Sequence, residues 1–565
     1  MNPCTNIFYQ IIFSTKQREH VLQKEFGRCF KSFVYLLIDF NKMINYRNFI
    51  VIISCFFSAC FLYSCKDYYR NKSNGAIPIS SIRKGERMAA KYCQSCHLLP
   101  GPHLLDAKTW EEGVLPVMGP HLGIFEFNFK RYPSAKNDKF LSKNFYPSQP
   151  QLNPQEWSDL INYYIATSPD SLAPQARQKQ LAPGLSLFQV QVPQFNYPTP
   201  AVSFIKIDSS TLPHQLVVCD ASQNIFRFNN QLQIIDTVHT SGPIVDMDFT
   251  QRPLVACNIA YMNPTNGKFG KAELLRINAN GGMQEGSTPL FSELARPIQV
   301  SSSDLNLDGR TDYLICGFGN LTGAFSWMEN KGGGKYENHV LRAVPGAIKA
   351  IVQDQNKDGL PDIWVLFGQG DEGIILFTNK GNGRFEQQRI LRFPPVYGST
   401  YFELIDFNKD GYQDIVYTCG DNSDYSQVLK PYHGVYIFLN DAKGNFSKKY
   451  FFPVNGCYKA IPRDFDGDGD LDIAAISFFA DYAKQPEEGF VYLENEGDFE
   501  FQPFIIPETK MGRWLTMDAG DLDGDGKVDI VLGNFSVAPV MIKPKVDWGK
   551  GPVFMFLKNM GKTRN

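Results

Sequence analysis

The sequence has no excess of charge of either sign. Its 565 residues include 56 lysines and arginines against 58 aspartates and glutamates, which gives a formal net charge of −2 at pH 7. Proteins that bind DNA or RNA usually carry a strongly basic face. We therefore expect no nucleic-acid partner.

The sequence also lacks a disulfide framework. Its 12 cysteines are scattered rather than regularly spaced. Most of those beyond residue 200 end short apolar runs, as in "LVVC" at Cys219 and "YLIC" at Cys316. We expect these cysteines to be small hydrophobic side chains within strands.

No apolar run reaches the roughly 20 residues that a helix needs to cross a bilayer. Residues 33–40 are too few and include Asp39. Residues 49–62 follow Arg47 and have the length and flank of the apolar part of a signal peptide. The run leads into "LYSC" at Cys65, which resembles a bacterial lipobox, whose cysteine is lipidated and becomes the first residue of the mature protein.

These patterns divide the N-terminal region into three parts. We expect residues 1–42 to be a non-native extension, residues 43–64 a lipoprotein signal peptide and residues 65–80 a tether. An uncleaved anchor helix is the alternative for the apolar run. The lipobox resemblance implies a protein of the bacterial cell envelope that is lipid-anchored to the membrane through Cys65 and is either periplasmic or surface-exposed.

The motif "CQSCH" from Cys93 to His97 is typical of covalent c-type haem attachment. Each thiol adds to one haem vinyl group, and the adjacent histidine is placed under the iron as an axial ligand. A redox cysteine pair or half a zinc site are the alternatives, but no second Cys/His pair follows at zinc spacing and no βαβ pattern surrounds the motif. Export agrees with haem, because c-type haem is attached outside the cytoplasm.

Two helices frame this motif. The first is expected to start at Ser80 or Ser81 and to run into the cysteines. The second has Asn153 as N-cap, Pro154 at the first helical position and Glu156 at the third, followed by an apolar stripe that ends at Ile165. This arrangement resembles the cytochrome c family over residues 80–170. The resemblance implies a small all-α domain at residues 81–170 with one covalent haem.

The second iron ligand has three candidates. Met118 lies in "GVLPVMGPHLG", a segment between prolines that we expect to be rigid and irregular, and cytochromes c commonly present an axial methionine from such a loop. His121 is the second candidate. His103 follows His97 too closely to reach the opposite face with ease. We expect Met118, and a His/Met pair leaves no open coordination position, which suits electron transfer.

The C-terminal two thirds of the chain are repetitive. The motif D-x-[DN]-x-D-G-x-x-D occurs five times, each time before an apolar strand, beginning at Asp304, Asp354, Asp406, Asp464 and Asp521. The repeats lie about 50 to 58 residues apart and contain enough strand patterns for four-stranded propeller blades. Two degenerate units precede them, which makes seven. Because the last unit is one strand short, we expect residues 185–193 to supply its outer strand.

The acidic loop has the oxygen pattern of a calcium site. Carboxylates or amides at positions 1, 3, 5 and 9 can surround a hard cation, and the glycine at position 6 permits the turn. The repeats resemble the FG-GAP/VCBS family, which includes the integrin α-chain head, over residues 185–560. The resemblance implies up to five Ca2+ ions, one per loop; a solvated aspartate turn is the alternative. The expected ligands are Asp304, Asn306, Asp308, Asp312, Asp354, Asn356, Asp358, Asp362, Asp406, Asn408, Asp410, Asp414, Asp464, Asp466, Asp468, Asp472, Asp521, Asp523, Asp525 and Asp529.

The sequence therefore predicts a multidomain chain, with a small all-α cytochrome c domain followed by an all-β seven-bladed propeller. The expected function is electron transfer through the haem, with the propeller as docking surface or scaffold for a redox partner that the sequence does not identify. One alternative is a propeller dehydrogenase that oxidises a sugar or alcohol, although the chain has no glycine-rich cofactor fingerprint. The other is an adhesion or ligand-binding module with a haem redox sensor. We expect a carrier rather than a stand-alone enzyme.

Overall fold

The fold was analysed in a computed structural model. The structure describes residues 77–195, 197–278, 281–286, 288–423, 426–537 and 545–562. The chain divides into two compact units, residues 1–76 and 77–565, and the described residues belong to the second. The expected signal peptide and Cys65 lie outside the described residues. Within the described part, none of the helices has both the length and the apolar character needed to cross a bilayer.

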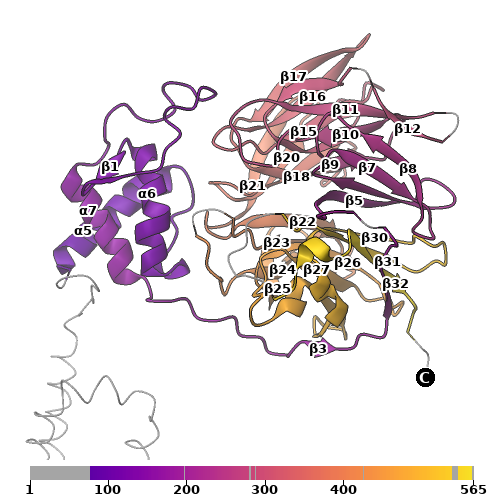
Figure 1. The fold of residues 1–565 in the computed structure, drawn as a ribbon. Helices are drawn as coiled ribbons and strands as arrows, with labels where there is room; N and C mark the ends of the chain where they lie inside the picture. The colour runs from indigo at the N-terminus through magenta and orange to yellow at the C-terminus, as the bar shows by residue number, and fades with distance from the viewer. Residues whose placement is uncertain are drawn as a thin grey trace, which may run out of the picture. The chain divides into compact units, whose positions relative to one another are not determined.

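The first part of the described chain is helical. Two long helices cross, and shorter turns of helix lie between them in sequence (Figure 1). A two-stranded hairpin also lies between them. The elements are α5 (Ile79–Tyr92), η1 (Cys93–Ser95), η2 (Pro102–Leu104), the π-helical turn η3 (Thr109–Val114), α6 (Leu115–Met118), η4 (Gly119–Leu122), β1 (Glu126–Phe127), β2 (Lys130–Arg131) and α7 (Pro154–Thr167).

The start of α7 follows the sequence prediction. The Asn153 side chain accepts hydrogen bonds from the backbone N–H groups of Gln155 and Glu156, and the Glu156 carboxylate accepts one from the Asn153 backbone. This reciprocal pair is a capping box, and Pro154 occupies the first turn, where no N–H is required. The predicted N-terminus of this helix is confirmed.

The start of α5 differs from the prediction. The helix begins at Ile79 after Pro78, so neither Ser80 nor Ser81 is its N-cap. Ser81 is buried inside the helix, where its hydroxyl donates to the Asp159 carboxylate of α7. The serine therefore joins two helices, and this tertiary hydrogen bond replaces the local one that the sequence pattern suggested.

A glycine allows α5 and α7 to pack closely. A Cβ atom added at Gly85 would lie 1.9 Å from the carbonyl oxygen of Asp159, so only glycine fits at this crossing. The core beside it contains Trp110, Trp157 and Tyr164, each at most 1% exposed. The two helices are thus held at a fixed distance around an aromatic core.

The rest of the described chain forms a seven-bladed all-β propeller (Figure 1). Each blade is an antiparallel sheet whose first strand is innermost. Blades 1 to 3 contain β5 (Val202–Asp208), β6 (Gln215–Asp220), β7 (Asn224–Phe228), β8 (Ile234–His239); β9 (Ile244–Asp248), β10 (Leu254–Asn258), β11 (Gly270–Ile277), β12 (Met283–Glu285), β13 (Phe291–Leu294); and β14 (Pro297–Ser303), β15 (Asp312–Gly317), β16 (Ala324–Gly332), β17 (Lys335–Arg342).

Blades 4 to 7 complete the ring. Their innermost strands contact one another in order, and the innermost strand of blade 7 contacts that of blade 1. The strands are β18 (Ala347–Gln353), β19 (Asp362–Phe367), β20 (Gly373–Asn379), β21 (Phe385–Arg392); β22 (Ser399–Ile405), β23 (Asp414–Cys419), β24 (Gly434–Asn440), β25 (Phe446–Pro453); β26 (Cys457–Arg463), β27 (Asp472–Ser477), β28 (Phe490–Asn495), β29 (Phe501–Ile505); and β30 (Trp514–Gly520), β31 (Asp529–Asn534), β32 (Phe554–Asn559).

The ring is closed by a strand from the N-terminal side. Strand β4 (Phe188–Gln191) pairs antiparallel with β32 and becomes the fourth strand of blade 7. The sequence prediction of this closure is confirmed. A short strand, β3 (Ala182–Pro183), also joins blade 6 in parallel to β29, and the sequence did not predict it.

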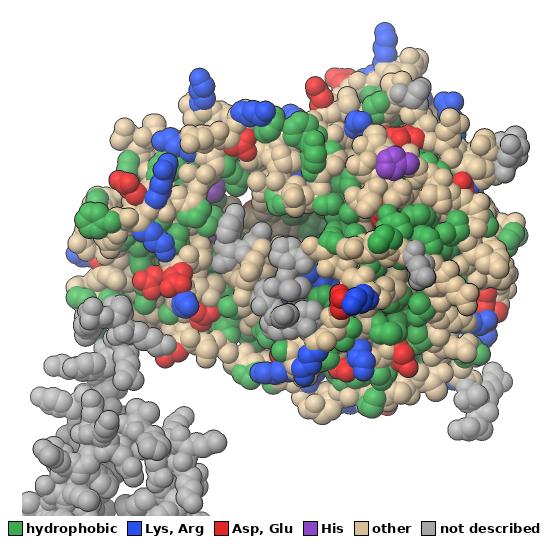
Figure 2. All heavy atoms as spheres, viewed as in Figure 1, with side chains coloured by type: hydrophobic (Ala, Val, Ile, Leu, Met, Phe, Trp, Pro, Cys, Tyr) green, Lys and Arg blue, Asp and Glu red, His purple; other side chains and the backbone are tan. Residues whose placement is uncertain are grey.

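The five cysteines of the propeller lie in strands, as expected. Each is a free thiol and is at most 1% exposed. They act as small apolar side chains in the inter-blade packing, and they form no disulfide. On the face drawn in Figure 2, acidic and basic side chains are interspersed, in agreement with the near-zero net charge.

Candidate functional site

The cysteine motif lies at the C-terminal end of α5. Cys93 caps the helix and is half-buried, whereas Cys96 is exposed, and both are free thiols. Burial, together with the nearby Cys96 thiol, raises the pKa of Cys93 to about 11. Two neighbouring free thiols at the end of a packed helix offer two attachment points for one covalently bound group.

The imidazole of His97 has one nitrogen occupied and one available. Its Nδ1 lies 3.0 Å from the carbonyl oxygen of Leu98, so this nitrogen carries the hydrogen and donates it. Burial lowers the pKa of His97, which favours the neutral ring. A neutral imidazole with a fixed Nδ1–H presents the Nε2 lone pair to a metal.

The segment after the motif is held by side chains of the helical core. Tyr164 donates to the carbonyl of Pro100 at 3.2 Å, and the Trp110 indole donates to the carbonyl of Pro102 at 2.8 Å. Ser168 also donates to Pro102 at 2.8 Å. These bonds satisfy carbonyls of a proline-rich segment that has no regular structure, and they fix the chain on the C-terminal side of His97.

Met118 and His121 lie in adjoining turns of helix. The segment is helical rather than irregular, because Pro116 and Pro120 both occupy first-turn positions that tolerate proline. Met118 ends α6 and is half-buried. The His121 ring packs edge-on against an aromatic pair, and burial, followed by the electrostatic effect of the nearby His97 imidazole, lowers the pKa of His121.

His103 lies elsewhere. It is exposed on η2, in agreement with its low rank among the candidate ligands. Met118 and His121 stay the predicted candidates for the position opposite His97.

Loops of the propeller pack against the helical part. The Tyr432 hydroxyl donates to the carbonyl of Leu104 at 3.0 Å, and its ring stacks on Tyr397 with centroids 4.6 Å apart. A second contact joins Asn266 of blade 2 to the Asp138 carboxylate at 2.8 Å. Two distant blades thus hold the helical part through specific polar bonds.

A cluster of arginines faces the motif from blades 3 and 4. Arg342 and Arg392 bind the Asp371 carboxylate at 3.0 and 2.9 Å, and Arg389 also contacts it. Three guanidinium groups around one carboxylate leave positive charge in excess. The charges of Asp371 and Arg392 act on the pKa of His97, which places this cluster within electrostatic range of the candidate iron ligand.

The acidic loops connect the first and second strands of blades 3 to 7. In the last loop the Asp521 carboxylate accepts from the backbone N–H groups of Asp525 at 3.1 Å and Gly526 at 2.9 Å. Ligand oxygens of the first, third and fifth aspartates lie within 4.8 Å of one another here and in the loop at Asp464. This spacing of carboxylates suits a hard divalent cation.

Lysines lie beside the two most acidic loops. Lys558 contacts Asp523, and Lys562 contacts Asp466. Lys562 also lies 2.8 Å from Glu494. Lys558 lies at the end of β32, and Lys562 lies in the segment after it. Cations of the blade that closes the ring therefore form ion pairs with both acidic loops.

The ninth aspartate of each loop also has a structural role. All five are fully buried, at 0% exposure. In blade 7, Asp529 accepts from the backbone N–H of Leu522 at 3.0 Å and from that of Asn559 at 2.8 Å. Burial raises the pKa of Asp529 to about 6. The residue therefore closes its loop and ties it to the third strand of the blade.

Each acidic loop has a left-handed backbone conformation at two positions. The sixth residue is always glycine, as predicted, with φ between +80° and +97°. The fourth residue is also left-handed, and three loops place Leu307, Lys357 and Lys409 there, at φ of 57° to 60°. The sequence did not reveal this second position, because only the two most acidic loops have glycine at it.

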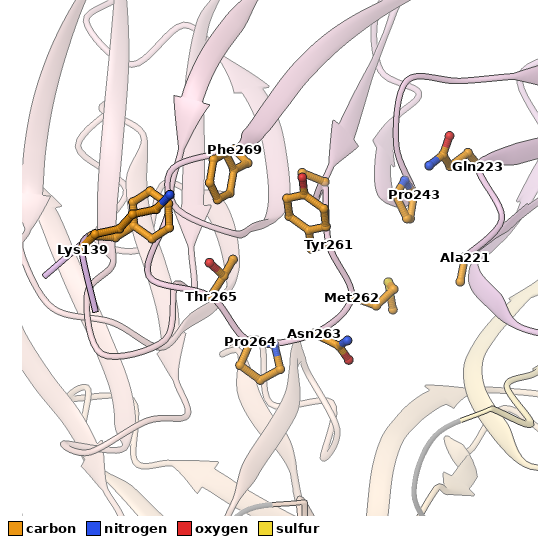
Figure 3. Close-up of a pocket in the computed structure, with 12 residues that line it drawn as sticks. Lys139, Ala221, Gln223, Pro243, Tyr261, Met262, Asn263, Pro264, Thr265 and Phe269 are labelled. Atoms are coloured by element: carbon orange, nitrogen blue, oxygen red, sulfur yellow. The ribbon is translucent and has the colours of Figure 1, made fainter. Parts of the chain in front are cut away.

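An open groove of about 650 Å³ is lined by loops of blades 1 and 2 and by Lys139 and Phe140 (Figure 3). Lys139 lines one side, and Gln223 and Pro243 line the other. Tyr261 and Phe269 pack edge-on with centroids 5.4 Å apart. The lining of the groove includes apolar side chains and one lysine. Such a lining suits binding, and it does not pair an acid with a base as a catalytic site would.

Two stretches of the propeller match a protein-family model described as an FG-GAP-like repeat, at residues 354–417 and 464–532. The chain contains FG-GAP-like repeats. These stretches hold the acidic loops of blades 4 to 7, so the predicted repeat family is confirmed there. The family-model match does not include the helical part.

A curated protein that part of this chain resembles is an integrin α-chain. Integrin alpha pat-2 of Caenorhabditis briggsae is 25% identical over 223 residues, which cover 34% of this chain and 18% of that protein. The match spans less than a fifth of the relative's length. The likeness is therefore to part of the integrin chain.

Proposed function

We propose that this protein transfers electrons through one covalent c-type haem and that its propeller serves as a docking surface or scaffold. Cys93 and Cys96 would hold the haem, and His97 would bind the iron. The observation that carries the proposal is the complete "CQSCH" motif at the end of a packed helix, with His97 Nδ1 bonded to Leu98 at 3.0 Å. When bound, the haem supplies one-electron chemistry.

Met118 is proposed as the second axial ligand. It lies at the end of α6 between two prolines that stiffen the chain on both sides. Methionine opposite histidine fills the coordination sphere, so the site favours electron transfer over binding of oxygen or substrate.

The acidic loops are proposed to bind calcium, with up to five ions in the propeller. The convergence of three carboxylates within 4.8 Å at Asp464 and Asp521 supports this, because closely spaced carboxylate oxygens are the ligands that a hard divalent cation prefers. Each ion would join the first and second strands of a blade. Its role there is structural.

An envelope location and lipid anchoring through Cys65 are part of the same proposal. The sequence signal is the "LYSC" that follows the apolar run. Mass spectrometry of the mature N-terminus tests it. A lipid-modified Cys65 at the N-terminus supports anchoring, and an uncleaved peptide that spans Ser64 and Cys65 contradicts it.

Haem attachment is tested on denaturing gels of exported full-length protein. The wild type should keep a haem stain after denaturation, and the double variant Cys93→Ala/Cys96→Ala should lose it. A matched control, Cys219→Ala/Cys316→Ala, removes two buried strand cysteines and should keep the stain. Haem that extracts freely from the wild type into acidified organic solvent would overturn the proposal.

A second candidate is a protein-binding module without electron transfer. It is favoured by the likeness of this chain to part of an integrin α-chain. The two candidates differ in one measurement. A protein that never acquires covalent haem but still forms a defined complex through its propeller fits the second candidate alone.

A further inference from the structure

Charged side chains gather on the axis of the propeller. They come, together with one tyrosine, from the innermost strands of six blades, and we call them the axial cluster: Lys206, Asp246, Asp248, Lys349, Tyr401, Glu403, Lys459, Arg463 and Asp518. Charges in the cluster act on one another across the axis, since those of Lys206 and Lys459 both lower the pKa of Lys349. The side chains of Lys206 and Arg463 are 42% and 40% exposed, so water reaches the cluster.

Two carboxylates of the axial cluster have cationic partners. Asp518 binds the Lys206 ammonium at 3.2 Å and accepts from the backbone N–H of Ile207 at 2.9 Å. Glu403 binds Arg463 at 3.0 Å and accepts from the Tyr401 hydroxyl at 2.6 Å. Both pairs join neighbouring blades. Their charges are therefore balanced within the protein.

The other two carboxylates, those of Asp246 and Asp248, accept hydrogen bonds from backbone N–H groups of blade 3, and Asp248 also accepts one from its own turn. Asp246 accepts from the backbone N–H of Val300 at 3.2 Å, and burial raises the pKa of Asp246 to about 7. Asp248 accepts from the backbone N–H groups of Thr250 at 2.8 Å and Ser302 at 2.7 Å. Neither carboxylate forms an ion pair with a lysine or arginine among the described residues.

Among the described residues, Lys349 and Lys459 form no close ion pair, although Glu403 is the strongest charge acting on Lys349 and Asp518 the strongest acting on Lys459. None of the ion pairs between described residues includes either lysine. Their ammonium groups lie 3.9 and 4.9 Å from the centroid of one ring, that of Tyr401, whose strand lies between theirs. Lys459 also donates to the carbonyl of Met517 at 2.8 Å. Burial, reinforced by the neighbouring cations, lowers the pKa of Lys349 to about 7.

We propose that Lys349 and Lys459 together bind a small oxyanion on the propeller axis. Two ammonium groups beside one aromatic ring repel each other, and an oxyanion with several acceptor oxygens would neutralise both and accept their free N–H donors. The Tyr401 ring would form one wall of the site. Phosphate, sulfate and a small carboxylate share this chemistry. The proposal is independent of haem and of calcium.

The test is calorimetric titration of the full-length protein with inorganic phosphate, and separately with sulfate and with acetate. The wild type should bind at least one of them saturably, and the strongest binder identifies the oxyanion class. Lys349→Gln and Lys459→Gln should each weaken binding by tenfold or more. Lys380→Gln is the matched control, because Lys380 pairs with Glu386 at 3.0 Å on the outside of blade 4.

Two results would overturn the proposal. The first is no saturable binding of any of the three anions to the wild type. The second is unchanged affinity in Lys349→Gln. Lys349→Arg keeps the charge and should keep binding, so it separates loss of the site from loss of the fold.

A labelling experiment on the unmutated protein gives an independent readout. Reductive methylation at neutral pH, followed by mass spectrometry of the peptides, should modify Lys349 readily because its amine is partly unprotonated. The anion that binds most strongly should slow modification of Lys349 and Lys459 severalfold and leave Lys380 unchanged. Equal rates with and without the anion would contradict the proposed site.

Discussion

At the scale of single residues, Met118 decides the chemistry of the candidate haem. Met118→His should lower the redox potential and keep six-coordinate iron, because a thioether favours reduced iron more than an imidazole does. Met118→Ala should open the iron to carbon monoxide. Both variants should lose the weak far-red sulfur-to-iron band of the oxidised protein, which absorption spectroscopy detects.

His103→Ala is the control for this experiment, since His103 is exposed and should leave the spectrum and the potential unchanged. Persistence of the far-red band in Met118→Ala would assign the ligand elsewhere. His121 would then be the ligand to test, because its ring already lies near that of His97.

A pair of glutamates in blade 2 predicts a pH-dependent stability. Burial and the adjacent Glu273 carboxylate raise the pKa of Glu285 to about 7, above its usual value in an unfolded chain. The folded state therefore holds a proton that the unfolded state releases, and stability is lost as pH rises from about 4.5 through 7. Glu285→Gln removes the repulsion. Because solvent screens a half-buried pair and reduces the effect well below the full pKa shift, the variant should raise stability at pH 8 by only about 1 kcal/mol.

Thermal denaturation between pH 5 and pH 8 measures this effect. The melting temperature of the wild type should fall toward pH 8, and that of Glu285→Gln should fall less. Glu293→Gln, an exposed position in the same blade, should follow the wild type. Parallel curves for the wild type and Glu285→Gln would contradict the prediction.

A functional residue can be predicted from the sequence when the residues that act with it lie close to it along the chain. The cysteine motif and the acidic loops are of this kind, because their ligands lie within nine residues of one another. Lys349, Tyr401 and Lys459 come together only when inner strands of three blades face one axis. No local spacing marks such a site, and the same holds for Asp371 and its arginines.

At the scale of elements, Asn559 joins the last strand to the acidic loops of blades 6 and 7. Its side-chain amide donates to the carbonyls of Phe465 at 2.7 Å and Val528 at 3.0 Å, and its oxygen accepts from Gly561 at 2.8 Å. Asn559→Ala leaves two buried carbonyls without a donor and should cost about 2 kcal/mol of unfolding free energy.

Chemical denaturation of the propeller provides the measurement. Asn445→Ala removes an asparagine from an exposed turn of blade 5 and should cost much less. Equal losses in the two variants would show that the buried amide bonds of Asn559 contribute little.

The elements differ in how well the sequence predicts them. The capping box of α7 was predictable because all its groups lie within four residues. The start of α5 was not, because the partner of Ser81 lies 78 residues away. Strand β3 has two residues and pairs with a strand more than 300 positions later, so no periodicity could reveal it.

For the whole molecule, calcium should determine thermal stability. Chelation should lower the melting temperature of the propeller, and added Ca2+ should restore it, because an ion that binds only the folded state stabilises by about 2.7 kcal/mol per site at a hundredfold excess over Kd. Asp466→Asn and Asp523→Asn should each reduce the bound calcium measured by elemental analysis.

Asp547→Asn is the control, because Asp547 is exposed and lies outside the acidic loops. Unchanged metal content and melting after chelation would show that the loops are simple turns. The comparison of loops is also informative, since those with asparagine at the third position carry less negative charge and should release calcium first.

The pairing of β4 with β32 sets an order for biosynthesis. The helical part and the cysteine motif leave the ribosome long before the last blade, whose edge strand β4 is made first and whose partner β32 is made last. Blade 7 can form only after β32 has been made, so any maturation of the cysteine motif can precede closure of the ring. A chain that stops before residue 554 would leave β4 without a partner and expose unpaired backbone on β31.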